Sequence, residues 1–217
     1  MRALLLASSS PRRKDLLEFL GVPFEILPSD FPEEDVEFGE LDDPKDYVLT
    51  IATGKALAVA DKLLAAPNQS PIILGADTAV FLDDKVYGKP RDFEDAKLIL
   101  RQLSGRKHLV VTGFMLLDPL TGEQYSEAVE TYVEFFKFQE EELERYIATG
   151  ESIGKAGAYA IQGEAKRFVR QVEGSVSNVV GLPLEAVAGG LEHMGIPVQV
   201  DVRQIVSRHF STDAFDN

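Results

Sequence analysis

Residues 2–13 read RALLLASSSPRR, an apolar run followed by three serines, a proline and two arginines. The run Leu4–Leu6 is typical of a short strand buried in a sheet. Ser10 and Pro11 predict the N-cap and the first residue of a helix, because proline has no N–H to lose at that position. This helix is expected to reach Gly21, which suits a left-handed C-terminal cap. The pattern therefore predicts a strand, a tight turn and a helix.

The turn between this strand and this helix is a candidate phosphate site. Backbone N–H groups and the positive end of the helix dipole converge there, beside three hydroxyl groups. Arg12 and Arg13 fall in the first helical turn, where the dipole disfavours a cation by about 0.3–1 kcal/mol, so a bound anion is the simplest reason for them. An ordinary capping turn with solvated arginines is the alternative.

Composition limits the class of protein. A chain of 217 residues with 45% hydrophobic content can bury a substantial core, as one α/β domain or as two small lobes around a cleft. No stretch approaches the roughly 18 apolar residues of a membrane span, and the apolar run before the serines is too short for a secretory signal. We therefore expect a cytoplasmic protein. The absence of cysteine excludes disulfides, thiolate zinc sites and cysteine nucleophiles.

The charge balance limits the partners. A formal net charge of −14 argues against binding to DNA or RNA, because most non-specific affinity comes from lysine and arginine. A small polyanion in a local basic cleft is compatible with this charge. Neither repeats nor long linkers interrupt the sequence, so we expect a single domain over residues 1–210 and a frayed tail over residues 211–217.

Two features between residues 29 and 66 are candidates for the site. The acidic loop of residues 29–35 either faces water or places a carboxylate where it holds a divalent metal together with phosphate. A helix is predicted from Asp43 to near Ala66, and Lys55 falls on its apolar face, four residues from both Ile51 and Val59. Lys55 should therefore point to the core or to a cleft edge, unless its ammonium group snorkels past the apolar side chains to solvent.

Asp77 is the strongest catalytic candidate. It follows the apolar strand of residues 71–76, and ligands of α/β sheets bind at the carboxyl ends of strands, where Gly75 would leave room. Capping of a turn through Thr78 is the alternative role. The hairpin predicted over residues 79–87 should return Lys89 to the same region.

The rest of the chain predicts mainly structural elements. They are a helix capped by Asp92, antiparallel strands over residues 109–117 and 125–138, a helix over 140–148, a strand over 168–172 and a helix from Pro183 to about Gly195. The glycine-rich residues 154–163 let the backbone pass close to a ligand. Gln162 at their end either reads the amide edge of a base or satisfies nearby backbone groups.

Several motifs in this order resemble the Maf family of nucleoside triphosphate pyrophosphatases. They are residues 7–13, 75–78, 88–91, 154–163 and 177–183, and the resemblance extends from about residue 3 to residue 195. It implies an α/β fold similar to that of inosine triphosphate pyrophosphatases, with an elongated mixed β-sheet flanked by helices and two lobes around a nucleotide cleft. It also implies hydrolysis of a nucleoside triphosphate to monophosphate and pyrophosphate with magnesium or manganese. Homodimers are common in the family, although no apolar stripe here requires one.

The resemblance assigns roles to matching residues. Asp77 would be the proton acceptor, and Glu33 with Asp77 would hold the metal. The triphosphate would be held by Ser8, Arg12, Arg13, Lys55 and Lys89. Phe31 and Pro32 stand before Glu33, where the family pattern has a smaller residue and an acid.

The positions matching substrate specificity are similar to those of the branch that acts on dTTP, UTP and modified pyrimidine triphosphates. They are Arg12, Thr78 and Gln162. The branch acting on 7-methyl-GTP usually differs at the residue after the proline. The alternatives are a purine or 7-methyl-GTP substrate, and a non-catalytic nucleotide-binding regulator, because the family is also associated with inhibition of septum formation. Cleavage of a triphosphate with about four negative charges requires cations on the leaving pyrophosphate, and the arginines and lysines named above supply them.

Overall fold

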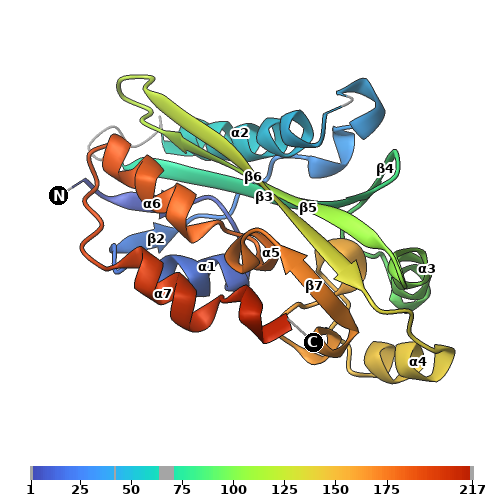
Figure 1. Ribbon diagram of the computed structural model, residues 1–217. Helices are drawn as coiled ribbons and strands as arrows, with labels where there is room; N and C mark the ends of the chain where they lie inside the picture. Colours follow the sequence, from blue (N-terminus) through green and yellow to red (C-terminus); the bar gives the residue numbers. More distant parts are fainter. Residues whose placement is uncertain (1, 42, 64–70, 216–217) are drawn as a thin grey trace.

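The computed structural model describes residues 2–41, 43–63 and 71–215. These residues form the expected α/β fold, built on a seven-stranded mixed sheet in the order β2-β1-β3-β5-β6-β7, with β4 paired to β3 (Figure 1). The strands are β1 (Leu4–Leu6), β2 (Phe24–Ile26), β3 (Ile72–Leu82), β4 (Lys85–Tyr87), β5 (Lys107–Leu117), β6 (Gln124–Phe135) and β7 (Val169–Glu173). The helices are α1 (Pro11–Glu18), α2 (Pro44–Leu63), α3 (Phe93–Leu103), α4 (Glu140–Ala148), α5 (Val176–Val180), α6 (Leu184–His193) and α7 (Val202–His209).

The sheet changes from parallel to antiparallel at β3. Strand β1 is parallel to β2 and to β3, and it pairs only with the first residues of β3, ending with Leu6 opposite Leu74. Strand β3 continues beyond that point, antiparallel to β5 as far as the pair Phe81 and Leu109. The middle of β3 therefore lies just past the carboxyl end of β1.

Helices cover both faces of the sheet. Helix α2 lies on one face, and α1, α5, α6 and α7 lie on the other, while α3 and α4 lie at one end of the long strands (Figure 1). Helix α2 approaches very closely at Gly75, where an added Cβ would lie 2.2 Å from the carbonyl oxygen of Ala52. The sheet backbone and the helix backbone are thus in direct contact, which fixes the position of α2.

The predicted helix boundaries are largely confirmed. Helix α1 begins at Pro11, although the Ser10 side chain makes no capping hydrogen bond within the described residues. Helix α3 begins as predicted, with the Asp92 carboxylate accepting a hydrogen bond from the N–H of Asp95. The predicted end of α2 near Ala66 lies outside the described residues.

The C-terminal part differs from the prediction. Helix α7 was not predicted, although Asp201 caps it and Val202, Ile205 and Val206 follow at helical spacing. The prediction of a frayed tail is wrong for residues 212–215. These residues form a 3₁₀ helix, and Phe215 is in the core with only 3% of its surface exposed. Residues 216 and 217 lie outside the described part.

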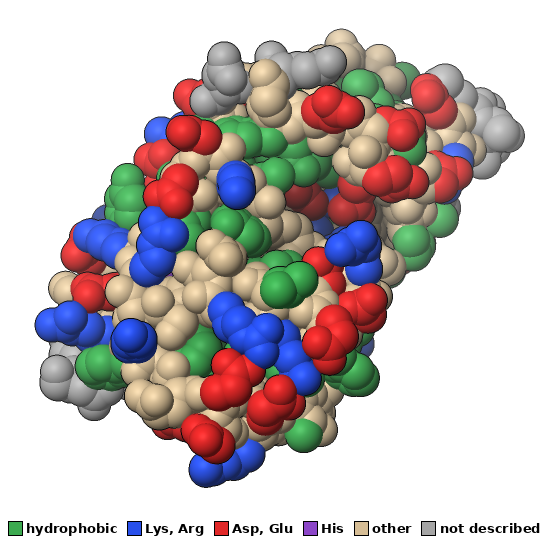
Figure 2. Space-filling model, turned by 90° about the vertical axis from the view of Figure 1, so that its right-hand side faces the viewer, with side chains coloured by type: hydrophobic (Ala, Val, Ile, Leu, Met, Phe, Trp, Pro, Cys, Tyr) green, Lys and Arg blue, Asp and Glu red, His purple; other side chains and the backbone are tan. Residues whose placement is uncertain are grey.

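Charged side chains of both signs share the surface. On the face shown in Figure 2, acidic and basic side chains are interspersed. Within the described ranges, none of the helices combines the length and apolarity needed to cross a bilayer.

Candidate active site

A cavity of about 350 Å³ lies beside the middle of β3 and the start of α1. Its walls contain every residue that the sequence predicts for the site, namely Ser8, Arg12, Arg13, Glu33, Lys55, Asp77, Thr78, Lys89 and Gln162. The structure thus brings together residues from widely separated segments, as expected. Their individual roles remain predictions.

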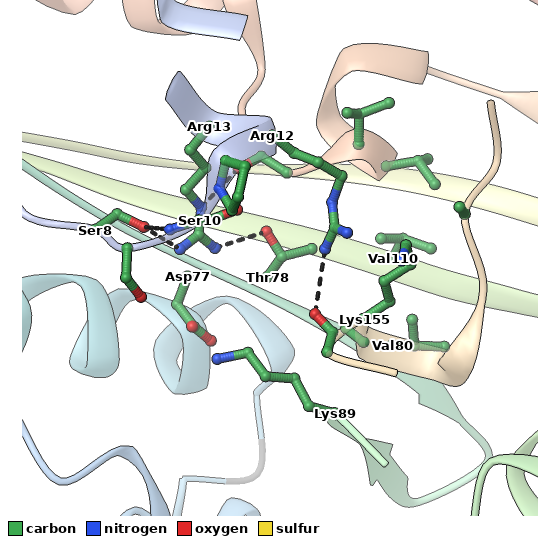
Figure 3. A pocket seen from close by; sticks show the side chains of 18 of the residues that line it. Ser8, Ser10, Arg12, Arg13, Asp77, Thr78, Val80, Lys89, Val110 and Lys155 are labelled. Carbon is green, nitrogen blue, oxygen red and sulfur yellow. Dashed lines mark hydrogen bonds between the residues drawn. The ribbon is translucent and has the colours of Figure 1, made fainter. Parts of the chain in front are cut away.

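Arg13 is a buried cation with neutral hydrogen-bond partners. Its guanidinium donates to Thr78 Oγ1 at 3.1 Å, to Ser8 Oγ at 3.3 Å and to the Gly181 carbonyl at 3.0 Å (Figure 3). Burial lowers the pKa of Arg13, and the nearby carboxylates of Asp77 and Glu33 oppose that shift. Because an arginine side chain stays protonated in a protein, the cavity carries a fixed positive charge here.

Arg12 provides a second positive charge on the same side of the cavity. Its guanidinium reaches the opposite wall, where it lies 3.4 Å from the carbonyl oxygen of Gly154 (Figure 3). Burial lowers the pKa of Arg12, and the charge of Arg13 lowers it further. An anion between the two guanidinium groups would offset their mutual repulsion, which favours the anion-site hypothesis over the solvated capping turn.

Four charged side chains form a chain of ion pairs across the cavity floor. The Lys55 ammonium lies 2.7 Å from Asp77 Oδ1 and 3.0 Å from Glu33 Oε1. Glu33 Oε2 lies 3.3 Å from the Lys89 ammonium. Burial raises the pKa of Glu33, but the two neighbouring ammonium groups outweigh it and hold that pKa below its usual value. With only 5% of its surface exposed, Lys55 points into the site and does not snorkel to solvent.

Asp77 lies at a different kind of position from the one predicted. It is in the middle of β3, paired in register with Gly113 of β5, so it neither ends a strand nor caps a turn. Ligands of α/β sheets bind at the carboxyl ends of strands, and the strand that ends beside the cavity is β1, whose last residue Leu6 pairs with Leu74 of β3. Gly75 makes room for α2, not for a ligand. Asp77 is 6% exposed, and its carboxylate is paired with Lys55 beside the cavity.

The opposite wall contains residues that the sequence did not single out. Val80, Val110 and Tyr159 give it an apolar character suited to the flat face of a base, and Lys155 adds a cation. Burial and the charge of Arg12 lower the pKa of Lys155. Val80 and Val110 lie on strands, and Lys155 and Tyr159 lie in the glycine-rich segment. Both sequence contexts are equally typical of a protein core, so only the tertiary arrangement shows that these residues line a cavity.

Gln162 makes a backbone contact, one of the two roles considered for it, while reading of a base stays a prediction. It lines the cavity, and its Nε2 donates to the carbonyl oxygen of His209, the last residue of α7, at 3.4 Å. A backbone contact therefore orients the amide while the side chain stays at the rim.

The carboxylates fit one kind of metal site. Among the described residues there is no cluster of three or more histidine, cysteine, aspartate or glutamate side chains placed to hold a metal ion. Magnesium characteristically uses only one or two carboxylates and takes its other ligands from phosphate and water. Asp77 and Glu33, which share Lys55 as a partner, are a donor set of that type.

The chain is similar to known proteins over most of its length. Residues 3–194 match the family described as Maf-like protein. A protein of Ruminiclostridium cellulolyticum named dTTP/UTP pyrophosphatase is 45% identical over 194 residues, which cover 89% of this chain and 97% of the relative. Proteins with the same name from Citrifermentans bemidjiense and Anaeromyxobacter dehalogenans are 47% and 46% identical, over 89% and 90% of this chain and 96% and 95% of their own lengths. With motifs, cavity and overall similarity in agreement, the chain belongs to the Maf family.

Proposed function

We propose that the chain hydrolyses dTTP, UTP and related pyrimidine nucleoside triphosphates to the monophosphate and pyrophosphate. The observation that carries this proposal is the placement of Arg13, Lys55 and Lys89 around one buried carboxylate, Asp77, in a cavity with an apolar wall. The names of relatives that are 45–47% identical support the choice of substrate. We further propose that the reaction takes place in the cytoplasm, where nucleotide pools are found.

The chain's own residues account for most of the chemistry. Arg12, Arg13 and Lys89 bind the triphosphate and stabilise the charge that develops on the leaving pyrophosphate. Asp77 accepts a proton from the water that attacks the α-phosphorus, so a new phosphorus–oxygen bond forms while the bond to the bridging oxygen breaks. We propose that Asp77 and Glu33 hold magnesium, which would supply further charge neutralisation at the phosphates.

A nucleotide panel tests the proposed reaction. The protein is incubated with magnesium and, separately, with dTTP, UTP, CTP, ATP, GTP, ITP and 7-methyl-GTP, and the released pyrophosphate and monophosphate are measured. We expect the highest kcat/KM for dTTP and UTP. Preference for a purine nucleotide would contradict the proposed substrate, and binding without any pyrophosphate release would favour the regulator instead of the enzyme.

Asp77→Asn tests the proposed proton acceptor. Asparagine has nearly the same shape but cannot accept the proton, so we expect kcat for UTP to fall about 10²–10⁴-fold while nucleotide affinity changes little. Asp84→Asn is the matched control, because Asp84 is an exposed residue in the turn after β3. A rate close to that of the wild type in Asp77→Asn would remove Asp77 from this role.

A further inference from the structure

Thr112 lies behind the cavity, in the layer of side chains that supports Arg13. It is on β5, directly opposite Thr78 of β3 in the sheet register, and it is 0% exposed. Its Oγ1 lies 2.9 Å from Thr78 Oγ1 and 2.9 Å from the carbonyl oxygen of Asn178. Complete burial keeps Thr112 from touching a nucleotide, so any effect on the site must pass through its neighbours.

The direction of these hydrogen bonds follows from the number of hydrogens. A carbonyl oxygen only accepts, so the single hydroxyl hydrogen of Thr112 goes to Asn178. Thr112 must then accept from Thr78, whose own single hydrogen is used in that bond. Thr78 therefore presents only lone pairs to the Arg13 guanidinium, which donates to it at 3.1 Å.

This chain of hydrogen bonds closes at α5. The Asn178 carbonyl also accepts from the N–H of Gly181 at 3.0 Å, and the Gly181 carbonyl accepts from Arg13 Nε at 3.0 Å. Helix α5 and its C-cap thus hold Arg13 twice, once directly through Gly181 and once through Thr112 and Thr78. The orientation of the guanidinium consequently depends on a hydroxyl group that lies outside the cavity.

We infer that Thr112 is a positioning residue, which fixes Thr78 as a pure hydrogen-bond acceptor and thereby orients Arg13 toward the triphosphate. The inference rests on the proposed function, because it gives Arg13 a polyanion to bind. Without the Thr112 hydroxyl, the hydrogen of Thr78 is free to turn toward the guanidinium, where a donor would face a donor. Arg13 then keeps its charge but loses one of its fixed acceptors.

The test compares two substitutions of Thr112 with one of Thr131. Thr112→Val removes the hydroxyl at nearly constant shape, and Thr112→Ser keeps it. Thr131→Val is the matched control, because Thr131 is also 0% exposed and its hydroxyl also bonds to the α5 region, at Ser175 and Asn178. Affinity for tripolyphosphate is measured by calorimetry, and kcat and KM are measured with UTP.

We expect Thr112→Val to weaken tripolyphosphate binding and to raise KM about tenfold, with a smaller change in kcat. Thr112→Ser and Thr131→Val should stay within about twofold of the wild-type affinity. In an Arg13→Ala background, Thr112→Val should change the affinity by no more than about twofold, because the two residues act together. If Thr112→Val does not fold, Thr78→Val interrupts the same chain and should give the tenfold loss.

The outcomes separate the inference from the proposed function. Wild-type affinity in the folded Thr112→Val variant, or an equal loss in Thr131→Val, would overturn the inference while leaving the enzyme intact. If the tripolyphosphate affinity depends on the Thr112 hydroxyl but the wild-type protein releases no pyrophosphate, the inference would be supported and the proposed reaction contradicted.

Discussion

At the scale of single residues, Lys55 is central to the site. Its buried ammonium group bridges Asp77 and Glu33, whereas Lys89 reaches Glu33 from a position where 60% of its side chain is exposed. The two lysines therefore differ in what they contribute. Lys55 compensates a buried carboxylate in the folded protein, and Lys89 provides a charge that is available to a ligand.

Replacing each lysine by methionine should separate these contributions. Lys55→Met leaves Asp77 without its cation in a buried position, so we expect the free energy of unfolding to fall by about 2–4 kcal/mol. Lys89→Met should change it by less than about 0.5 kcal/mol, because exposed ion pairs contribute little. Urea denaturation at pH 7.5 measures both, and equal losses would show that burial of Lys55 is energetically unimportant.

Sequence patterns predicted residues that line one cavity, but not the geometry that joins them. The period of the apolar residues in α2 correctly placed Lys55 on the inner face, because that pattern depends on local helix geometry alone. The pattern around Gly75 and Asp77 suggested a strand end, since both residue types favour turns. Pairing with β5 from Ile73 to Phe81 keeps the strand continuous, and such pairing is a tertiary effect.

At the scale of elements, the contact between α2 and β3 sets the distance between Lys55 and Asp77. Gly75 allows this contact, because its missing side chain lets the carbonyl of Ala52 lie against the strand. The sheet and the helix that carry the central ion pair are thus held together at a point two residues from Asp77.

Gly75→Ala should disrupt both stability and activity. The new methyl group would lie 2.2 Å from a backbone oxygen, so α2 must move, and we expect a loss of about 2–3 kcal/mol in the free energy of unfolding. The control is Gly189→Ala at an exposed position of α6, where an added Cβ meets nothing within 4 Å and helix propensity predicts a gain of about 0.5–1 kcal/mol. Thermal and urea unfolding should both show a loss of stability for Gly75→Ala and a gain for Gly189→Ala. An unchanged free energy of unfolding in Gly75→Ala would contradict the close contact.

At the scale of the whole molecule, a buried histidine links stability to pH. His108 on β5 is 2% exposed, and its Nε2 lies 2.9 Å from the hydroxyl of Tyr159 on the cavity wall. Burial lowers the pKa of His108 to about 4. In the unfolded chain the histidine pKa is about 6.5. Between these two values the folded protein keeps the imidazole neutral, whereas the unfolded chain has bound a proton.

The sign of the pH effect follows from this difference. Between about pH 6.5 and pH 4 the unfolded state binds more protons, so the stabilising contribution of neutral His108 is complete above that range and declines as the pH falls. We expect a loss of about 2 kcal/mol from pH 7 to pH 5. His108→Gln can keep the hydrogen bond without titrating. From pH 7 to pH 5 its free energy of unfolding should therefore fall by about 2 kcal/mol less than that of the wild type. Parallel plots of unfolding free energy against pH for the two proteins would show that His108 is not the source of the pH dependence.

The side chains on the two sides of the cavity differ in how closely hydrogen bonds hold them. Arg13 and Lys55 are held by buried contacts as short as 3.0 and 2.7 Å, whereas Arg12 and Gln162 at the rim make exposed contacts of 3.4 Å. Directed evolution toward other bases can therefore vary the exposed Gln162 at small cost to folding, whereas the neighbouring Tyr159 and Ile161, like most residues of β3, belong to the buried core. New selectivity and retained turnover are separable goals in this scaffold.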